Sequence, residues 1–147
     1  MNTERKIQLQ QSFERSEIMK LFRAEANIIL EGHFEITVSK QSFMIRPAGM
    51  FNGSTIASLV DVSAGYAAAS ATLSDSYFTT VELKINYLNP AMGEKLIAKA
   101  QVIKNGKRLS VVRSDIFAVQ GNEEISAATS LVTLMQLQNN HNETQID

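Results

Sequence analysis

The chain has 147 residues, the usual size of a single domain, and it contains no cysteine, which excludes disulfides, thiolate metal sites and cysteine nucleophiles. Its formal net charge is −1, so no overall positive field favours nucleic acid or an anionic membrane surface. The N-terminal sequence lacks the apolar core of a signal peptide, and no apolar run approaches membrane-spanning length. We therefore expect a cytoplasmic protein that does not insert into membranes.

The first half of the chain predicts a helical segment, a hairpin and one long helix. Apolar residues with roughly helical spacing, Phe13, Ile18 and Leu21, indicate an N-terminal helical segment over residues 1–24. Alternation from Ala26 to Val38, with a break at Gly32, indicates a β-hairpin. Asn52 is a good N-cap type and precedes an Ala-rich stretch, so we expect the principal helix to run from there to about residue 73.

The second half alternates with a period of two and predicts antiparallel strands. Apolar residues alternate with polar ones over 81–87, 96–102, 109–119 and 125–134. Asn105-Gly106 predicts a hairpin with a type I′ turn, and Gly121-Asn122 predicts the next turn. Residues 136–147 are almost wholly polar, so we expect a disordered tail there. The fold class is α+β, with one long helix beside an antiparallel sheet of five to six strands.

Motifs in a fixed order resemble those of the PaaI-type acyl-CoA thioesterases of the hotdog superfamily. The likeness covers about residues 25–135 and comprises three motifs: Arg46-Pro47-x-Gly49-x-x-Asn52-Gly53-Ser54 with Leu59-Val60-Asp61, Thr80-x-x-x-x-Ile85-x-Tyr87-Leu88-x-Pro90, and Asn105-Gly106-Lys107-Arg108. The resemblance implies one hotdog domain over 25–135, in which a curved antiparallel sheet wraps a central helix. It also implies a homodimer or a dimer of dimers.

The resemblance also implies roles for three residues in thioester hydrolysis. Asp61 matches the residue that activates water or attacks the thioester, and the Gly53 amide matches the group that polarises the carbonyl. Thr80 matches a residue that helps hold the water. Asn52 stands where many members have the His of His-Gly-Gly, and Arg46 stands where many have Asn. As an N-cap, Asn52 needs no catalytic role at all.

The rise of a helix limits which of these residues can act on the same substrate carbonyl within one chain. Nine residues separate Asn52 from Asp61, and a helix spaces them by about 13 Å. Both cannot reach one carbonyl from the same chain. In a two-fold dimer with antiparallel helices, Asp61 of one protomer can face the Gly53 amide of the other. Hydrolysis would use water as the second substrate, so we expect no metal and no cofactor besides the coenzyme A of the substrate.

Substrate contacts are predicted from charge and from neighbours of the site. Arg46, Lys104, Lys107 and Arg108 are candidates for the phosphates of coenzyme A, although the last three are also typical of a solvated hairpin. Ser54 offers a further amide at the helix N-terminus, and Met50 and Phe51 favour a hydrophobic or aromatic acyl group. The alternative is a non-catalytic hotdog module that binds acyl-CoA or a related lipid ligand, which the missing His would favour.

Overall fold

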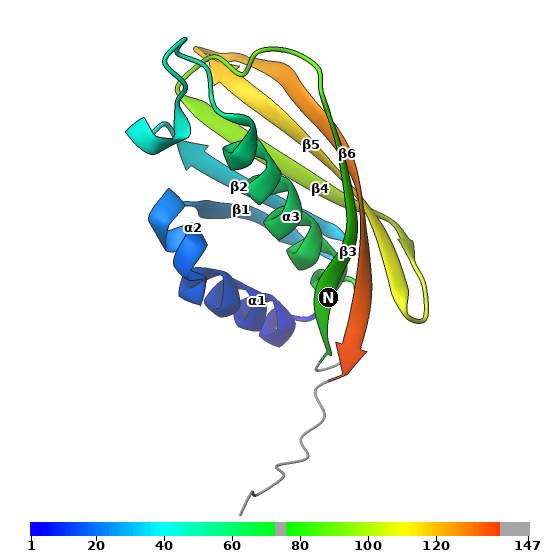
Figure 1. Cartoon of the computed structure of the whole chain (residues 1–147). Helices are drawn as coiled ribbons and strands as arrows, with labels where there is room; N and C mark the ends of the chain where they lie inside the picture. Colours follow the sequence, from blue (N-terminus) through cyan, green and yellow to red (C-terminus); the bar gives the residue numbers. More distant parts are fainter. Residues whose placement is uncertain (73–75, 139–147) are drawn as a thin grey trace, which may run out of the picture.

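A six-stranded antiparallel sheet wraps around one long helix in the computed structural model, which describes residues 1–72 and 76–138 (Figure 1). The elements in chain order are α1 (Thr3–Arg15), α2 (Glu17–Phe22), β1 (Glu25–Leu30), β2 (His33–Ser39), the 3₁₀ turn η1 (Ser42–Met44), α3 (Gly53–Ser70), β3 (Ser76–Tyr87), β4 (Lys95–Asn105), β5 (Leu109–Gln120) and β6 (Glu123–Gln138). The strand order is β1-β2-β4-β5-β6-β3, so β1 and β3 form the two edges.

The α+β class is confirmed, and three boundaries differ from the sequence expectation. Helix α3 ends at Ser70, and the expected end at residue 73 lies outside the described residues. Strand β3 begins at Ser76, before the alternation that was visible at 81. Strand β6 continues to Gln138 and so includes the first three residues of the expected tail, because Gln136 to Gln138 pair with the first residues of β3. Residues 139–147 of the expected tail lie outside the described residues.

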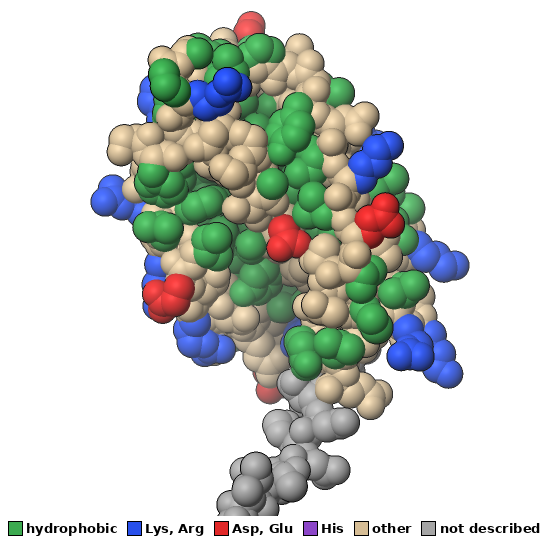
Figure 2. All heavy atoms as spheres, in the orientation of Figure 1, with side chains coloured by type: hydrophobic (Ala, Val, Ile, Leu, Met, Phe, Trp, Pro, Cys, Tyr) green, Lys and Arg blue, Asp and Glu red, His purple; other side chains and the backbone are tan. Residues whose placement is uncertain are grey.

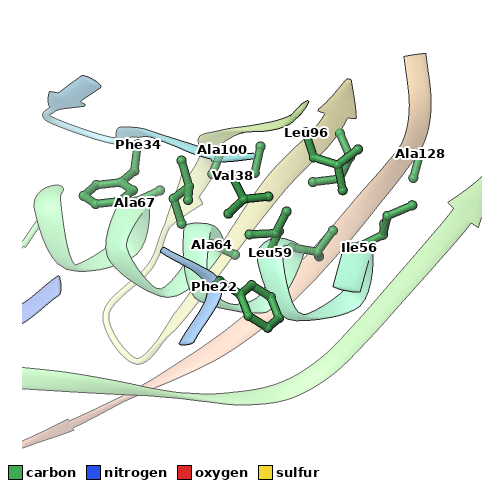
Figure 3. Close-up of a cluster of buried hydrophobic side chains, with 14 of the residues drawn as sticks. Phe22, Phe34, Val38, Ile56, Leu59, Ala64, Ala67, Leu96, Ala100 and Ala128 are labelled. Carbon is green, nitrogen blue, oxygen red and sulfur yellow. The ribbon is translucent and has the colours of Figure 1, made fainter. Parts of the chain in front are cut away.

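The core lies between α3 and the concave face of the sheet. Ala64, Ala67 and Ala68 of α3 are fully buried, and their small side chains let the helix backbone approach the strands closely. Figure 3 shows Leu59 and Ala67 on the side of α3 that faces Val38 and Ala100 of the sheet. The expectation of a helix held tightly by a curved sheet is confirmed.

The N-terminal segment belongs to the same core. Leu9, Phe13, Met19 and Phe22 are buried. The Phe13 ring lies 5.7 Å from the Phe34 ring and 5.5 Å from the Tyr66 ring, measured between centroids. Helix α1 thus packs across the C-terminal half of α3, and this contact forms one wall of the site described below.

The structure contains both predicted hairpin turns, but the geometry predicted for one of them is wrong. Gly121-Asn122 joins β5 to β6 with positive φ at Gly121, as expected. The β4–β5 hairpin exists, but neither Asn105 nor Gly106 has positive φ, so the type I′ turn is wrong. The loop comprises residues 106–108, and the Gly106 amide donates to the Leu109 carbonyl oxygen at 2.8 Å. Glycine is needed there for space, since a Cβ would lie 2.7 Å from that oxygen.

Candidate active site

Asp61 and Thr80 form the polar centre of the site. Asp61 lies on the exposed side of α3, two turns from its N-terminus, and Thr80 lies on the edge strand β3. The Thr80 hydroxyl donates to Asp61 Oδ1 at 2.6 Å, a short charge-assisted hydrogen bond. A bulge in the pairing of β3 with β6 follows Thr80. The contact fixes one carboxylate oxygen and leaves the other for a substrate.

These two residues line a pocket of about 380 Å³, which we call the Asp61 pocket. It follows one face of α3 through Val62, Gly65, Tyr66 and Ala69, and α1 and β3 form its sides. Figure 2, in the orientation of Figure 1, shows hydrophobic side chains over much of the visible surface, interrupted by an acidic side chain near the middle. The pocket is large enough for part of a ligand and has a carboxylate at one end.

The N-terminus of α3 is held rigidly by Asn52. The Asn52 Oδ1 accepts from the Thr55 amide at 2.8 Å, from the Thr55 hydroxyl at 2.7 Å and from the Ser54 hydroxyl at 2.9 Å. Its Nδ2 donates to the Phe43 carbonyl oxygen at 3.0 Å. The predicted N-cap is confirmed. The Asn52 side chain is therefore held within the chain through both its oxygen and its nitrogen, whereas its catalytic role stays a prediction.

Gly53 is the first residue of α3, and its N–H belongs to the set that a helix leaves without an internal partner. Among the described residues we find no acceptor for it. The Tyr87 hydroxyl donates to the Gly53 carbonyl oxygen at 2.9 Å, which ties the helix end to β3. The free N–H and the positive end of the helix dipole can stabilise a developing oxyanion.

A second pocket of about 440 Å³, the Gly53 pocket, opens at this helix end. Its lining includes four of the predicted substrate and oxyanion residues: Arg46, Met50, Phe51 and Gly53. Tyr87, Leu88 and Pro90 form the opposite side. Arg46 is exposed, whereas Phe51 is 3% exposed. Asp61 does not line this pocket, and Gly53 does not line the Asp61 pocket.

The other predicted substrate residues lie apart from both pockets. The Ser54 hydroxyl is exposed and bonds to Asn52. Lys104, Lys107 and Arg108 are exposed around the β4–β5 hairpin. That hairpin lies at the C-terminal end of α3, where Asn105 Nδ2 donates to the Ala71 carbonyl oxygen at 3.1 Å. Within one chain, this basic cluster and Gly53 are therefore at opposite ends of the helix, and its role in phosphate binding stays a prediction.

Sequence reasoning missed the contribution of α1 to the site. Arg5 and Leu9 of α1 both line the Asp61 pocket. Their spacing of four puts them on one face of a helix, which is the signal that could have found them. Sequence alone gave no reason to place α1 beside Asp61.

The described part of the chain shows neither a metal-binding cluster nor a membrane-spanning helix. Residues 1–72 and 76–138 contain no cluster of three or more His, Asp or Glu that could hold a metal ion. In the same ranges, no helix combines the length and the apolarity needed to cross a membrane.

Comparison with named proteins gives two relatives of known or suspected activity. The candidate esterase SSO1253 of Saccharolobus solfataricus is 30% identical over 131 residues, which cover 88% of this chain and 84% of that protein. The medium/long-chain acyl-CoA thioesterase YigI of Escherichia coli is 26% identical over 99 residues, 58% of this chain and 62% of YigI. The chain thus spans less than two thirds of the length of YigI.

Solved structures and a family profile agree with these relatives. A thioesterase family protein from Silicibacter pomeroyi superposes with a TM-score of 0.88 at 30% identity and covers 91% of this chain and 98% of its own. The PaaI protein of Escherichia coli superposes with a TM-score of 0.81 at 20% identity, over 92% and 95% of the two chains, which shows a shared fold. The profile of the thioesterase superfamily matches residues 48–125. The chain belongs to the thioesterase superfamily and has the hotdog fold that its motifs predicted.

Proposed function

We propose that this protein hydrolyses acyl-CoA thioesters at two equivalent sites, each shared between the protomers of a homodimer. The observation that carries the proposal is the division of the catalytic groups on α3. The carboxylate and its Thr80 partner lie in one pocket, and the free Gly53 amide lies in another. A complete site needs both groups, because thioester hydrolysis requires an activated nucleophile and a stabilised oxyanion.

The exposed edge of the sheet supports the dimer. Strand β3 has 12 residues and no neighbour on its outer side among the described residues. It exposes large hydrophobic side chains at Tyr77, Val81 and Tyr87. A long apolar edge strand is a surface for pairing with another chain. Antiparallel pairing of two copies of β3 about a two-fold axis would set the two α3 helices antiparallel, with Asp61 of one protomer near Gly53 of the other.

The proposed reaction has one proton transfer before the tetrahedral intermediate forms and one when it collapses. Asp61 removes a proton from water, the water oxygen bonds to the thioester carbon, and the partner's Gly53 amide hydrogen-bonds the oxyanion. When the intermediate collapses, the carbon–sulfur bond breaks and the proton passes to the coenzyme A thiolate. Direct attack by Asp61 followed by hydrolysis of the resulting anhydride is the other route. Thr80 holds Oδ1 in either case and leaves Oδ2 to act.

The two pockets divide the substrate between them. We assign the phosphates of coenzyme A to the side of the Gly53 pocket, because Arg46 is an exposed cation on its rim. Lys104, Lys107 and Arg108 are further candidates if the partner's hairpin lies nearby. The acyl group would enter the Asp61 pocket. The name of YigI supports medium or long acyl chains, and no cofactor is required by this chemistry.

Thiol release from a panel of acyl-CoA thioesters tests the proposal. We expect turnover by the native protein and a loss of about 10²–10⁴-fold in kcat for Asp61→Asn, which keeps the shape and removes the base. Glu94→Gln is the matched control, because Glu94 is exposed and lines neither pocket. Equal activity of Asp61→Asn and the native protein would contradict the assignment of Asp61.

The second candidate is a module that binds acyl-CoA without turnover. It is favoured by one observation, namely that Asn52 is engaged as an N-cap where many PaaI-type members have a His. Tight binding of acyl-CoA by calorimetry, with no thiol release from any thioester in the panel, would establish this alternative.

A further inference from the structure

The Asp61 pocket carries a positive charge at the end opposite the catalytic carboxylate. Arg5 of α1 lines this pocket and is half-buried. Its Nη2 donates to the Ala69 carbonyl oxygen at 3.0 Å, in the last turn of α3. Asp61 and Ala69 are eight residues apart on the same helix, which corresponds to about 12 Å.

Arg5 has donors that the protein does not satisfy. No ion pair involves Arg5 among the described residues. Its Nη1 donates to Gln8 Oε1 at 3.4 Å, and its Nε is buried and has no hydrogen-bond partner in that part of the chain. One further N–H remains on each of Nη1 and Nη2, and a guanidinium is suited to binding a carboxylate through two such hydrogen bonds. An anion at this end of the pocket would therefore be stabilised by Arg5.

The space between Asp61 and Arg5 is open along the helix. Gly65 lies midway, and a Cβ added there would meet only Leu134 Cδ2, at 3.9 Å. Alanine would fit and would favour the helix by about 1 kcal/mol, so glycine leaves volume in the pocket at a cost in stability. Tyr66 forms the adjacent wall, and its hydroxyl is 3.1 Å from the Ser12 hydroxyl. A partly polar stretch of the Asp61 pocket thus lies between the Asp61 carboxylate and the Arg5 guanidinium.

We infer that the preferred acyl group ends in a carboxylate, so that the substrate is the mono-coenzyme A thioester of a dicarboxylic acid and Arg5 binds its free carboxylate. This rests on the proposed function. An extended chain advances about 1.2 Å per bond, so an eight-carbon diacid spans roughly 8 Å between its two carbonyl carbons. That length leaves room within the Asp61 to Ala69 interval for the contacts at both ends.

The test compares suberyl-CoA with octanoyl-CoA, which differ only in the terminal group. We expect the native protein to favour suberyl-CoA by about tenfold in kcat/KM, the effect of one charge-assisted interaction. Arg5→Met should bring this ratio close to one, and Arg5→Lys, which keeps the charge without the two-pronged geometry, should give an intermediate ratio. Lys6→Met, an exposed neighbour on α1, should keep the native ratio. Because the ratio is taken within one preparation, partial unfolding of a variant does not affect it.

Two results would overturn the inference while leaving the proposed function intact. One is turnover with no preference for suberyl-CoA in the native protein. The other is an equal loss on both thioesters in Arg5→Met, which would assign Arg5 to the coenzyme A moiety. If no thioester is hydrolysed, the proposed function fails, and calorimetry then decides the inference: tighter binding of suberyl-CoA that depends on Arg5 supports it, and equal binding of the two thioesters overturns it.

Discussion

The two ends of the candidate site on α3 differ in how strongly the protein holds them. At the N-terminus, Asn52 makes four hydrogen bonds and Tyr87 bonds the Gly53 carbonyl, so the Gly53 backbone is fixed from several sides. Two turns later, Asp61 is exposed, and among the described residues its carboxylate accepts a hydrogen bond from Thr80 alone. An oxyanion donor works best when it is immobile, whereas a base or nucleophile needs a free oxygen that can exchange protons.

Because of this difference, we expect substitutions of Asn52 and of Asp61 to change different quantities, stability in the first case and rate in the second. Residues at the N-terminal end support the position of a backbone group, so their loss affects folding as well as rate. In the proposed function, residues around Asp61 contact the substrate or the carboxylate, so we expect their loss to affect the rate alone. The predictions below separate the two kinds of effect, beginning with the largest.

Removing the Gly53 N–H should cause the largest loss after loss of Asp61 itself. Gly53→Pro deletes this N–H at the first helical position, where proline is well tolerated. Asn52 has φ −82° and ψ 153°, which is the extended conformation that a residue before proline prefers. We expect kcat to fall by about 10²–10³-fold, as for the loss of one oxyanion donor, with a nearly unchanged circular dichroism spectrum.

Gly53→Ala is the matched control, because it adds a carbon at the same place and keeps the N–H. Its Cβ would lie 3.3 Å from the Tyr87 hydroxyl, a tight contact that requires a small shift. We expect Gly53→Ala to lose far less activity than Gly53→Pro. Equal losses in the two variants would mean that Gly53 acts through packing and not through its N–H.

Thr80→Val should reduce kcat by about tenfold, because it removes a hydrogen bond to a charged group and keeps the size of the side chain. Thr80→Ser should restore most of the activity, since the hydroxyl returns. Thr79→Val serves as the control on the same strand, because Thr79 does not line the Asp61 pocket. Steady-state kinetics would count against this role if Thr80→Val and Thr79→Val behaved alike.

Asn52→Ala should affect stability more than chemistry. Loss of the N-cap should lower the free energy of unfolding by about 1–2 kcal/mol, measured by urea denaturation at a fixed protein concentration. Asn52→Asp, which can still cap the helix but loses the hydrogen bond to the Phe43 carbonyl oxygen, should retain part of that stability. A large fall in kcat for Asn52→Asp with stability preserved would instead assign a chemical role to the Asn52 amide group.

Much of the fold could be predicted because local patterns agree with it. The period-two alternation, the Ala-rich helix with Asn52 as its N-cap, and the Gly121-Asn122 turn each depend on residues close in sequence. The type I′ turn at Asn105-Gly106 was wrong because Asn105 pairs with Ser110, and this register, which no local pattern reveals, leaves a connection longer than the two residues of such a turn. The extension of β6 to Gln138 depends on pairing with β3, which lies far away in sequence.

The residues of the candidate site that belong to a motif could be predicted from the sequence, whereas those that reach the site only through packing could not. Asp61, Gly53 and Thr80 belong to motifs, and the structure brings Thr80 into hydrogen-bond contact with Asp61, while their catalytic roles stay predictions. Arg5 was invisible because its place beside Ala69 follows from the packing of α1 against α3, through Phe13 and Tyr66. No local pattern encodes such a long-range contact.

The central claim is that each site takes Asp61 from one protomer and Gly53 from the other, and mixed dimers test it directly. Protomers with Asp61→Asn and protomers with Gly53→Pro carry different affinity tags, and the heterodimer is purified through both. A shared site predicts one intact site per heterodimer and about half of the native activity, although each parent homodimer is nearly inactive. The control heterodimer pairs a native protomer with one carrying both substitutions, and it should be inactive. An inactive first heterodimer together with a half-active control would place each complete site within a single chain and would contradict the account.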